Sequence, residues 1–473
     1  PDAPRETTLR VDLSQDADSE PAIPAPVMVR PWAEALRGAA DLAVPDRQFR
    51  FLYDAALRTL ILHSPHEVYP GPYTYKRFWF RDAAFILHGM LCAGITGRVR
   101  HVLDRFPGRQ KIDGFFESQA GEWDSNGEAL WIMHRYAELT GDAPRDWKSA
   151  IVSGARWIRR KRLDDDGDAL HAGLLPAGFS AEHLGNNDFY YWDDFWGVAG
   201  LRAAAALCGR WDEDRHAERF EAEAQAFMGA IERSLRRSES VRRHPGLPAA
   251  PGRRMDTGAV GSLVAGYPLA LLDETHPALF ATADFLFRNS LVHGAFFQDM
   301  IHSGMNAYLT LHLAQVLLRA GDARALPLVR NVARLASPTG QWPEAIHPHT
   351  GGGCMGDGQH VWAAAEWVMM ARNCFVREEP DRLVLGSGIP PEWLQGPDGT
   401  RFGPTPTRWG PITVRVEAAG EAARVSWEAD WRAARPRIEV RLPGRPGKLV
   451  EDDQCASVEI PGAAANMEAR APE

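Results

Sequence analysis

Two adjacent carboxylates, Asp193 and Asp194, stand among aromatic side chains in the stretch 186–197, just before an alanine-rich apolar run at 198–207. Aromatic faces suit the C–H faces of sugar rings, and a carboxyl group among apolar rings keeps its proton to higher pH. The segment therefore predicts a general acid that works near neutral pH. The alternative is that both acids only occupy the first turn of a helix, where they interact favourably with the helix dipole.

A second carboxylate, Glu344, lies far along the chain, after Trp342 and ahead of a glycine-rich loop that leads into a predicted helix. An inverting glycosidase needs one carboxyl group as the acid and another, across the sugar, as the base that activates water. The two groups are then separated by roughly 6.5–9.5 Å. Asp193 and Glu344 suit these roles, with loop aromatic residues as platforms for the sugar.

Three histidines follow Glu344, at positions 347, 349 and 360, and they raise the alternative of a structural zinc site. No helical HxxxH pair and no matching set of carboxylates accompanies them, so no metal site is predicted. The sequence also has no G-x-S-x-G elbow and no dinucleotide fingerprint, and no Gly-Lys-Ser/Thr follows Gly351–Gly353. No cofactor is therefore predicted.

The loop at 76–82 carries a similar mixture of charged and aromatic side chains. It places Arg81 beside Asp82. An arginine next to an acid can hold a hydroxylated ligand through several directed hydrogen bonds. A local ion pair surrounded by core aromatic residues is the alternative.

The loop at 122–131 is the fourth segment of this kind. Trp123 and Asp124 are candidates for a sugar subsite. Ser125 and Glu128 instead fit a helix capping box, in which each side chain satisfies backbone groups of the first turn.

The composition is that of an ordinary globular chain of 473 residues, with 45% hydrophobic and 24% charged residues. The formal charge of −9 argues against an obligatory nucleic-acid partner. No 18-residue apolar run exists, so no transmembrane helix and no membrane partner are expected. Five widely spaced cysteines indicate free thiols in a reducing compartment, which predicts a cytoplasmic location. The oligomeric state is left open.

Apolar spacing predicts about eleven helices between residues 49 and 376. Their ranges are 49–62, 83–93, 124–140, 147–162, 194–209, 212–236, 257–271, 276–289, 303–320, 322–336 and 357–376. Paired helices without a repeat of fixed length, and with polar loops at one end, fit a barrel of helical hairpins better than a solenoid or a bundle.

Beyond about residue 380 the apolar pattern alternates as in half-buried strands. The predicted fold is mainly α, with three regions. Residues 1–30 are an irregular lead-in or the remnant of an upstream domain, residues 31–380 are an (α/α)6 barrel, and residues 381–473 are a small antiparallel β module.

The four polar segments, in this order, resemble motifs of the six-hairpin, or (α/α)6-barrel, glycosidases, which include glucoamylases, trehalases and processing α-glucosidases. Phe78–Asp82 resembles the W-x-R-D element of that family, and Trp123–Glu128 resembles its D-x-x-G-E element. Tyr191–Asp194 is similar to the segment in which a tryptophan precedes two acids, and Trp342–Glu344 to the one that holds the general base. The likeness covers about residues 45–395 and is nearest to bacterial glucoamylase-like or glycogen-debranching-like proteins.

The resemblance implies that Asp193 protonates the leaving oxygen and that Glu344 is the general base. The candidates for sugar binding are Trp79, Arg81, Asp82, Trp123, Asp124, Trp192, Asp194, His302 and Trp342. Two positions depart from the family pattern. Ala345 stands where a glutamine commonly follows the base, and Asp193 stands where glucoamylases have a glutamate but the trehalase branch has an aspartate.

The sequence therefore predicts an inverting, exo-acting glycoside hydrolase whose partner is an oligosaccharide or polysaccharide with α-glucosidic linkages. Two alternatives stay open. One is a carbohydrate-binding or regulatory protein without catalysis on the same scaffold. The other is a phosphorylase or lyase on the same barrel, since the fold hosts several reactions.

Overall fold

The chain divides into two compact units, Pro1–Arg37 and Gly38–Glu473. The first contains the short helix α1 (Trp32–Ala35), and all the other elements belong to the second. The computed structural model describes residues 31–165, 167–179, 186–239, 243–299, 303–396, 399–451 and 456–462. The predicted lead-in at 1–30 lies outside the described residues.

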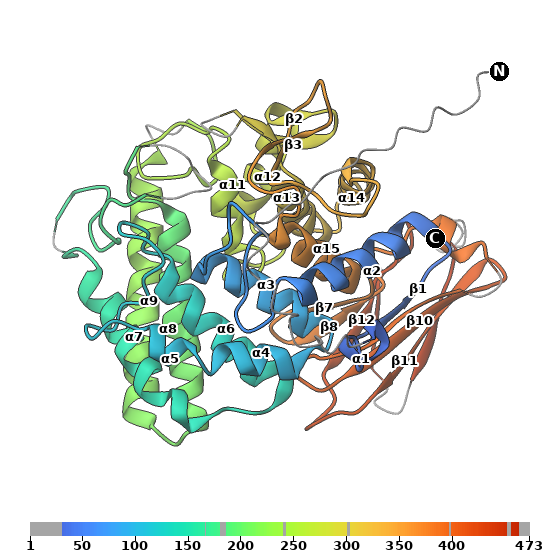
Figure 1. The fold of residues 1–473 in the computed structure, drawn as a ribbon, viewed down its shortest axis with the longest axis horizontal. Helices are drawn as coiled ribbons and strands as arrows, with labels where there is room; N and C mark the ends of the chain where they lie inside the picture. The colour runs from blue at the N-terminus through green and yellow to red at the C-terminus, as the bar shows by residue number, and fades with distance from the viewer. Residues whose placement is uncertain are drawn as a thin grey trace, which may run out of the picture. The chain divides into compact units, whose positions relative to one another are not determined.

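Six helical segments of the described chain, labelled in Figure 1, form a ring that is closed by their mutual contacts. In order around the ring they are α3 (Phe80–Cys92), α6 (Ser125–Thr140), α8 (Tyr191–Arg210), α11 (Ala259–Ser262) with the 3-10 turn η2 (Leu263–Ala265), α13 (Ala307–Arg319) and α15 (Val361–Phe375). Each segment contacts the next, and α15 contacts α3, which closes the ring. Helix α13 is buried over its whole length, as expected for a helix that is apolar on all sides.

Six further helices pack around this ring. They are α2 (Arg47–Leu62), α4 (Thr96–Leu103), α7 (Lys148–Lys161), α9 (Asp214–Arg237), α12 (Pro277–Asn289) and α14 (Ala325–Leu335). Each lies against inner helices and follows or precedes one in the chain. Helix α9 buries one stripe at helical spacing, including Phe220, Ala224, Phe227 and Ile231. The two rings form the predicted (α/α)6 barrel.

The fourth inner segment is much shorter than the helix predicted at 257–271. Helix α11 and η2 together end at Ala265. Gly266 and Pro268 follow, and proline cannot continue a helix because its ring clashes with the preceding turn. The shorter connecting helices of the barrel are α5 (Phe106–Arg109) and η1 (Arg145–Trp147).

Glycine allows two neighbouring inner helices to approach closely. A Cβ atom on Gly127 of α6 would lie 2.2 Å from the Trp196 carbonyl oxygen of α8, and one on Gly200 would lie 2.7 Å from the Gly127 Cα. Any side chain at either position would push α6 and α8 apart. This contact sets the spacing between the helix that begins after Asp124 and the helix that carries Asp193.

The C-terminal strands form two sheets. One contains β1 (Asp41–Ala43), β9 (Thr400–Thr405), β10 (Ile412–Ala419), β11 (Ala422–Ala429) and β14 (Ser457–Ile460). The other contains β7 (Val376–Glu378), β8 (Arg382–Leu385), β12 (Arg437–Val440) and β13 (Lys448–Val450). The 3-10 turn η3 (Pro391–Leu394) lies between β8 and β9 in the sequence. Strand β1 was not predicted because three residues are too short to show alternation.

The strand pairs of both sheets are antiparallel except for β8 and β12, which pair in parallel. The chain leaves one sheet after β8, builds β9 to β11 of the other sheet, and returns at β12. A crossover of this length allows two strands to run in the same direction. The alternating apolar pattern beyond residue 380 carried no information about this connection.

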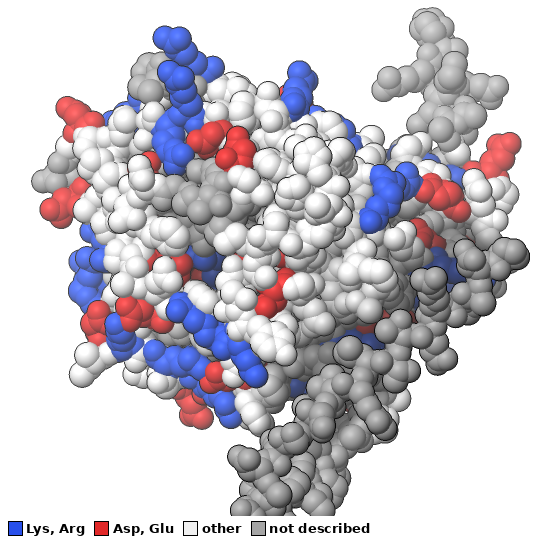
Figure 2. Space-filling model, turned by 45° about the horizontal axis from the view of Figure 1, so that its top comes forward, with Lys and Arg blue, Asp and Glu red and all other residues white. Residues whose placement is uncertain are grey.

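A third, small sheet lies within the barrel loops: β2 (Leu291–Val292), β3 (Ala295–Gln298), β4 (Gly304–Met305), β5 (Ala345–Ile346) and β6 (Gly353–Met355). It joins the loop after α12 to the loop after α14, and β5 begins directly after Glu344. No helix in the described part of the chain is long and apolar enough to cross a bilayer. On the face drawn in Figure 2, acidic and basic side chains are interspersed.

Candidate active site

The predicted site residues gather at the N-terminal ends of the inner helices. Arg81 is the second residue of α3, Asp124 precedes α6, and Asp193 is the third residue of α8. His360 directly precedes α15. These helix ends form one mouth of the barrel, which we call the N-terminal mouth.

Arg81 lies in a cluster of acids at this mouth. Its side chain is 4% exposed, and its Nε donates to Asp124 Oδ2 at 2.8 Å. Glu122 and Glu128 lie 3.6 and 4.0 Å from the guanidinium. The Trp192 indole donates to the same Asp124 oxygen at 2.9 Å. The network ties α3, α6 and α8 together and leaves more negative than positive groups.

Asp193 is fully enclosed, with 1% of its surface exposed. Neither carboxyl oxygen has a hydrogen-bond partner among the described residues. Burial raises the pKa of Asp193 well above its ordinary value, and the nearby Asp124 and Asp194 charges raise it further. The raised pKa favours the protonated form of Asp193, and its carboxyl group is not engaged in hydrogen bonds with the described residues.

Asp194 points elsewhere, although it is adjacent in sequence. Its Oδ1 accepts a hydrogen bond from the Leu175 backbone N–H at 2.9 Å, and burial raises its pKa to about 8. Its contact holds the turn at 173–178 against α8. Asp194 thus has a structural partner, whereas Asp193 has none in the described chain.

Glu344 is half-buried at the end of the loop between α14 and β5. The Tyr75 hydroxyl donates to Glu344 Oε2 at 2.6 Å, and the Asn306 side chain donates to the Glu344 backbone oxygen at 2.9 Å. Gly356, with a φ of +63°, lies so close that a Cβ atom there would be 2.7 Å from Glu344 Oε2. Both the side chain and the backbone of Glu344 are therefore held in place.

Asp357 positions the loop that supplies Tyr75. Its carboxylate accepts backbone N–H groups of Tyr73, Thr74 and Tyr75 at 3.2, 3.0 and 3.1 Å. Burial opposes ionisation of Asp357, but these three donors lower its pKa below the ordinary value. The aspartate thus stays charged and fixes the chain next to Glu344.

The surroundings of both catalytic candidates include residues of the first turn of α3. Asp193 lies within electrostatic range of Arg81. Tyr75, which contacts Glu344, has a pKa raised first by burial, then by Glu344 and also by Asp82. Arg81 and Asp82 are consecutive, so this turn connects the surroundings of both acids.

The remaining sugar-binding candidates differ in their surroundings. Trp79 is half-buried, contacts Tyr75 edge to face, and has the Arg77 guanidinium 3.7 Å above its ring. Trp123 lies under the Lys161 ammonium at 3.6 Å and donates to the Ala177 oxygen. These contacts place Trp79 beside Tyr75 and direct Trp123 toward α7.

Trp342 is completely buried and donates to the Val332 oxygen at 2.9 Å, so no face of its ring is open to a sugar in this structure. It instead packs against Trp367. His302 lies outside the described residues. Trp192 is likewise buried, where it fixes Asp124.

Tyr75 and Asp357 were not among the predicted site residues. Asp357 stands between glycines in the loop after Glu344, and this Gly-Asp-Gly pattern was the available signal. The sequence could not show that this carboxylate reaches the loop at 73–75, because the two lie more than 280 positions apart.

The histidines near Glu344 do not converge. His347 contacts His349, whereas His360 is buried against Tyr75 and Tyr308, and burial lowers its pKa to about 3. Among the described residues, no group of three or more His, Cys, Asp or Glu side chains has a metal-binding arrangement.

Sequence comparison with protein families and with curated proteins finds no match. Comparison with solved structures finds a glycosidase in complex with glucose, at a TM-score of 0.55 and 15% identity over 70% of this chain and 99% of that one. A bacterial glucoamylase complexed with acarbose matches at 0.56 and 14% identity, over 72% of this chain and 57% of its own. A GH78 rhamnosidase of Bacillus sp. GL1 matches at 0.58 and 15% identity, over 85% and 42%. The chain therefore has the helical-barrel fold of these glycosidases.

Proposed function

We propose that this protein is an inverting glycoside hydrolase, with Asp193 as the general acid and Glu344 as the general base. The observation that carries the proposal is the buried, unpartnered carboxyl group of Asp193 beside the Arg81–Asp124–Trp192 network. Its raised pKa supplies the protonated form that a general acid needs. The fold shared with glycosidases supports the same reaction class.

In this mechanism Asp193 transfers its proton to the glycosidic oxygen as the bond from that oxygen to the anomeric carbon breaks. Water attacks the anomeric carbon from the opposite face, and Glu344 takes the proton that the water loses. The product sugar has the inverted anomeric configuration. The Tyr75 hydroxyl, which donates to Glu344 Oε2, would orient the carboxylate so that its other oxygen faces the water.

Arg81, Asp82 and Asp124 would bind the terminal sugar. Arg81 and Asp124 lie at helix N-termini within electrostatic range of Asp193, and Asp82 follows Arg81 and acts on Tyr75. Charged groups of this kind form directed hydrogen bonds to hydroxyl groups. We infer exo action on α-glucosidic ends of an oligosaccharide or polysaccharide. The acarbose complex of the similar glucoamylase and the glucose complex of the similar glycosidase favour a glucosidic substrate.

The test is hydrolysis of maltose, isomaltose, kojibiose, trehalose and glycogen, with proton NMR of the product at early times. From glycogen, whose leaving group stays on the polymer, we expect the released glucose to appear first as the β anomer. Initial release of α-glucose from glycogen would contradict inversion. Saturable sugar binding without any product would favour a binding protein, and product that requires phosphate would favour a phosphorylase.

The acid role of Asp193 and the base role of Glu344 can be tested separately with two substrates whose leaving groups differ in their need for protonation. Asp193→Asn should lower kcat/KM on a disaccharide by about 10²–10⁴-fold, but much less on α-glucosyl fluoride, because fluoride leaves with little help from an acid. Glu344→Gln should lower both activities. The exposed Asp146→Asn and Glu218→Gln serve as charge-matched controls, and near-full activity of either site variant on the disaccharide would refute its role.

A further inference from the structure

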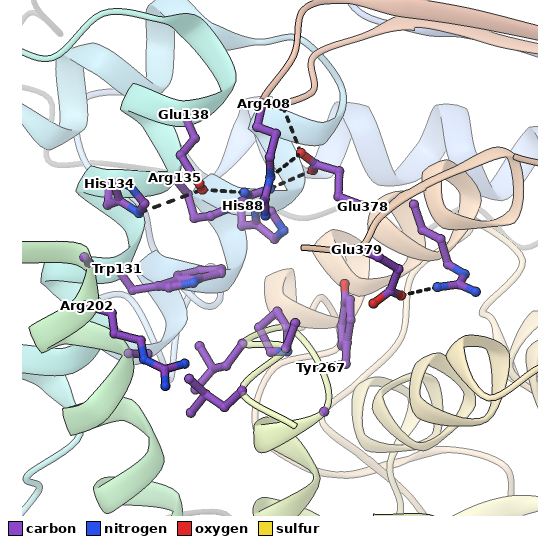
Figure 3. A pocket seen from close by; sticks show the side chains of 18 of the residues that line it. His88, Trp131, His134, Arg135, Glu138, Arg202, Tyr267, Glu378, Glu379 and Arg408 are labelled. Carbon is purple, nitrogen blue, oxygen red and sulfur yellow. Dashed lines mark hydrogen bonds and ion pairs between the residues drawn. The ribbon is translucent and has the colours of Figure 1, made fainter. Parts of the chain in front are cut away.

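A cavity of about 290 Å³ lies among the C-terminal halves of the same inner helices (Figure 3). Its size is near the lower end for ligand pockets, which hold about 300–1000 Å³. Six arginines and three glutamates line it: Arg135, Arg202, Arg319, Arg372, Arg377, Arg408, Glu138, Glu378 and Glu379. We call it the arginine pocket.

The arginine pocket is separate from the candidate active site. Along α8, Arg202 lies nine residues after Asp193, which at helical rise is roughly 13 Å. Between the two levels, Trp131 and Trp196 pack edge to face, and Phe85 packs on Trp196 and stacks on Trp362. This aromatic layer fills the barrel between its two mouths.

Five of the six arginines have carboxylate partners. Arg135 and Arg372 each lie 2.8 Å from Glu378, and Arg408 lies 3.6 Å from it. Arg319 forms a two-bond pair with Glu379, at 2.7 and 3.2 Å. Arg377 pairs with Glu379 and also with Glu274, which does not line the pocket. These groups hold one another in place.

Arg202 is the exception, since no partner for its guanidinium is present among the described residues. Tyr267 is 6% exposed, and its hydroxyl is buried without a hydrogen-bond partner there. His88, also 6% exposed, has an unpaired Nδ1 in the described chain. Figure 3 shows Arg202 near Trp131, with Tyr267 on the opposite side of the pocket.

We propose that the arginine pocket binds a small metabolite that carries a multiply charged oxyanion, either phosphate or carboxylate groups. The paired arginines supply a rigid, net positive wall, while Arg202 and Tyr267 supply donors that the protein itself leaves unused. Arginine favours such anions because its planar fork matches two oxygens at once. Trp131 provides an apolar face for the carbon part of the ligand. Burial holds the pKa of His88 well below its ordinary value, so the positive charge comes from arginine at neutral pH.

Isothermal titration calorimetry of the full chain, at constant ionic strength set with chloride, tests the proposal. Inorganic phosphate, glucose 6-phosphate and citrate are the probes, and glucose is the neutral comparison. We expect at least one anion to bind with one-to-one stoichiometry. Binding by phosphate alone, by the sugar phosphate or by citrate each supports the site and identifies which oxyanion it takes.

Arg202→Gln and Tyr267→Phe should each weaken that binding by about tenfold or more, which is the usual value of a hydrogen bond to a charged group. Arg156→Gln, an exposed arginine on α7, removes the same charge elsewhere and should leave affinity unchanged. Asp193→Asn should also leave it unchanged, which separates this pocket from the active site. No binding by any anion, or equal weakening in Arg156→Gln, would overturn the proposal.

Discussion

The two mouths of the barrel are built on the same helices but carry opposite charge. At the N-terminal mouth, four acids surround Arg81. In the arginine pocket, among the C-terminal halves of these helices, arginines outnumber glutamates. The helix macrodipole explains this division, because it stabilises negative groups at N-termini and positive groups at C-termini. Charge at a helix end is therefore expected and does not by itself identify a site.

The two ends differ in the kind of polar group that lacks a partner. In the arginine pocket these groups are hydrogen-bond donors, such as the Tyr267 hydroxyl, whereas at the N-terminal mouth both carboxyl oxygens of Asp193 are unpaired among the described residues. A buried polar group without a hydrogen bond costs folding free energy. Such groups are retained where another role, such as binding or proton transfer, requires them.

The largest effect that we expect is a loss of stability in Glu378→Gln, which tests the buried ion pairs of the arginine pocket. The substitution leaves Arg135 and Arg372 buried without their shared carboxylate and should destabilise the fold by about 3–5 kcal/mol. Chemical denaturation monitored by circular dichroism measures it. Glu392→Gln, which breaks an exposed pair with Arg330, should cost less than about 1 kcal/mol. Similar losses of stability in both variants would show that the buried ion pairs contribute no more than the exposed pair.

Tyr75→Phe tests the N-terminal mouth. It removes the hydrogen bond to Glu344 but keeps the ring that contacts Trp79. A hydrogen bond to a charged group is worth about 1.5–3 kcal/mol, so kcat/KM should fall by about 10–150-fold. The fall should be in kcat at unchanged thermal stability. Tyr73→Phe is the control because Tyr73 is 86% exposed, and equal activity of both variants would remove Tyr75 from the mechanism.

Asp194→Asn gives an effect on stability that depends on pH. The folded-state pKa of Asp194 is raised to about 8, so the folded protein keeps a proton that the unfolded chain loses. Its contribution is fully present below the unfolded pKa and is lost as pH rises toward 8, by up to about 1.4 kcal/mol per pH unit.

The asparagine variant should therefore lose less stability than the original chain between roughly pH 5 and pH 8. Thermal unfolding at several pH values measures the difference in slope. The exposed Asp146→Asn should follow the original chain. Parallel curves for Asp194→Asn and the original chain would show that Asp194 ionises normally in the folded state.

The sequence by itself determined the helical class, the strand-rich C-terminus and the segments that carry the site. Period and composition are local properties, so α13 and α9 could be recognised without knowing their neighbours. The pairing of acid and aromatic residues likewise marked Asp193 and Glu344 as chemically unusual positions.

Only the tertiary structure decided which of these residues meet and which are enclosed. Asp193 and Asp194 are equivalent in sequence, yet only Asp194 finds a backbone donor, at Leu175. Trp342 looked like a sugar platform but is packed in the core. Asp357 reaches a loop more than 280 positions away. These outcomes depend on contacts between segments far apart in the sequence, which only the closed barrel brings together.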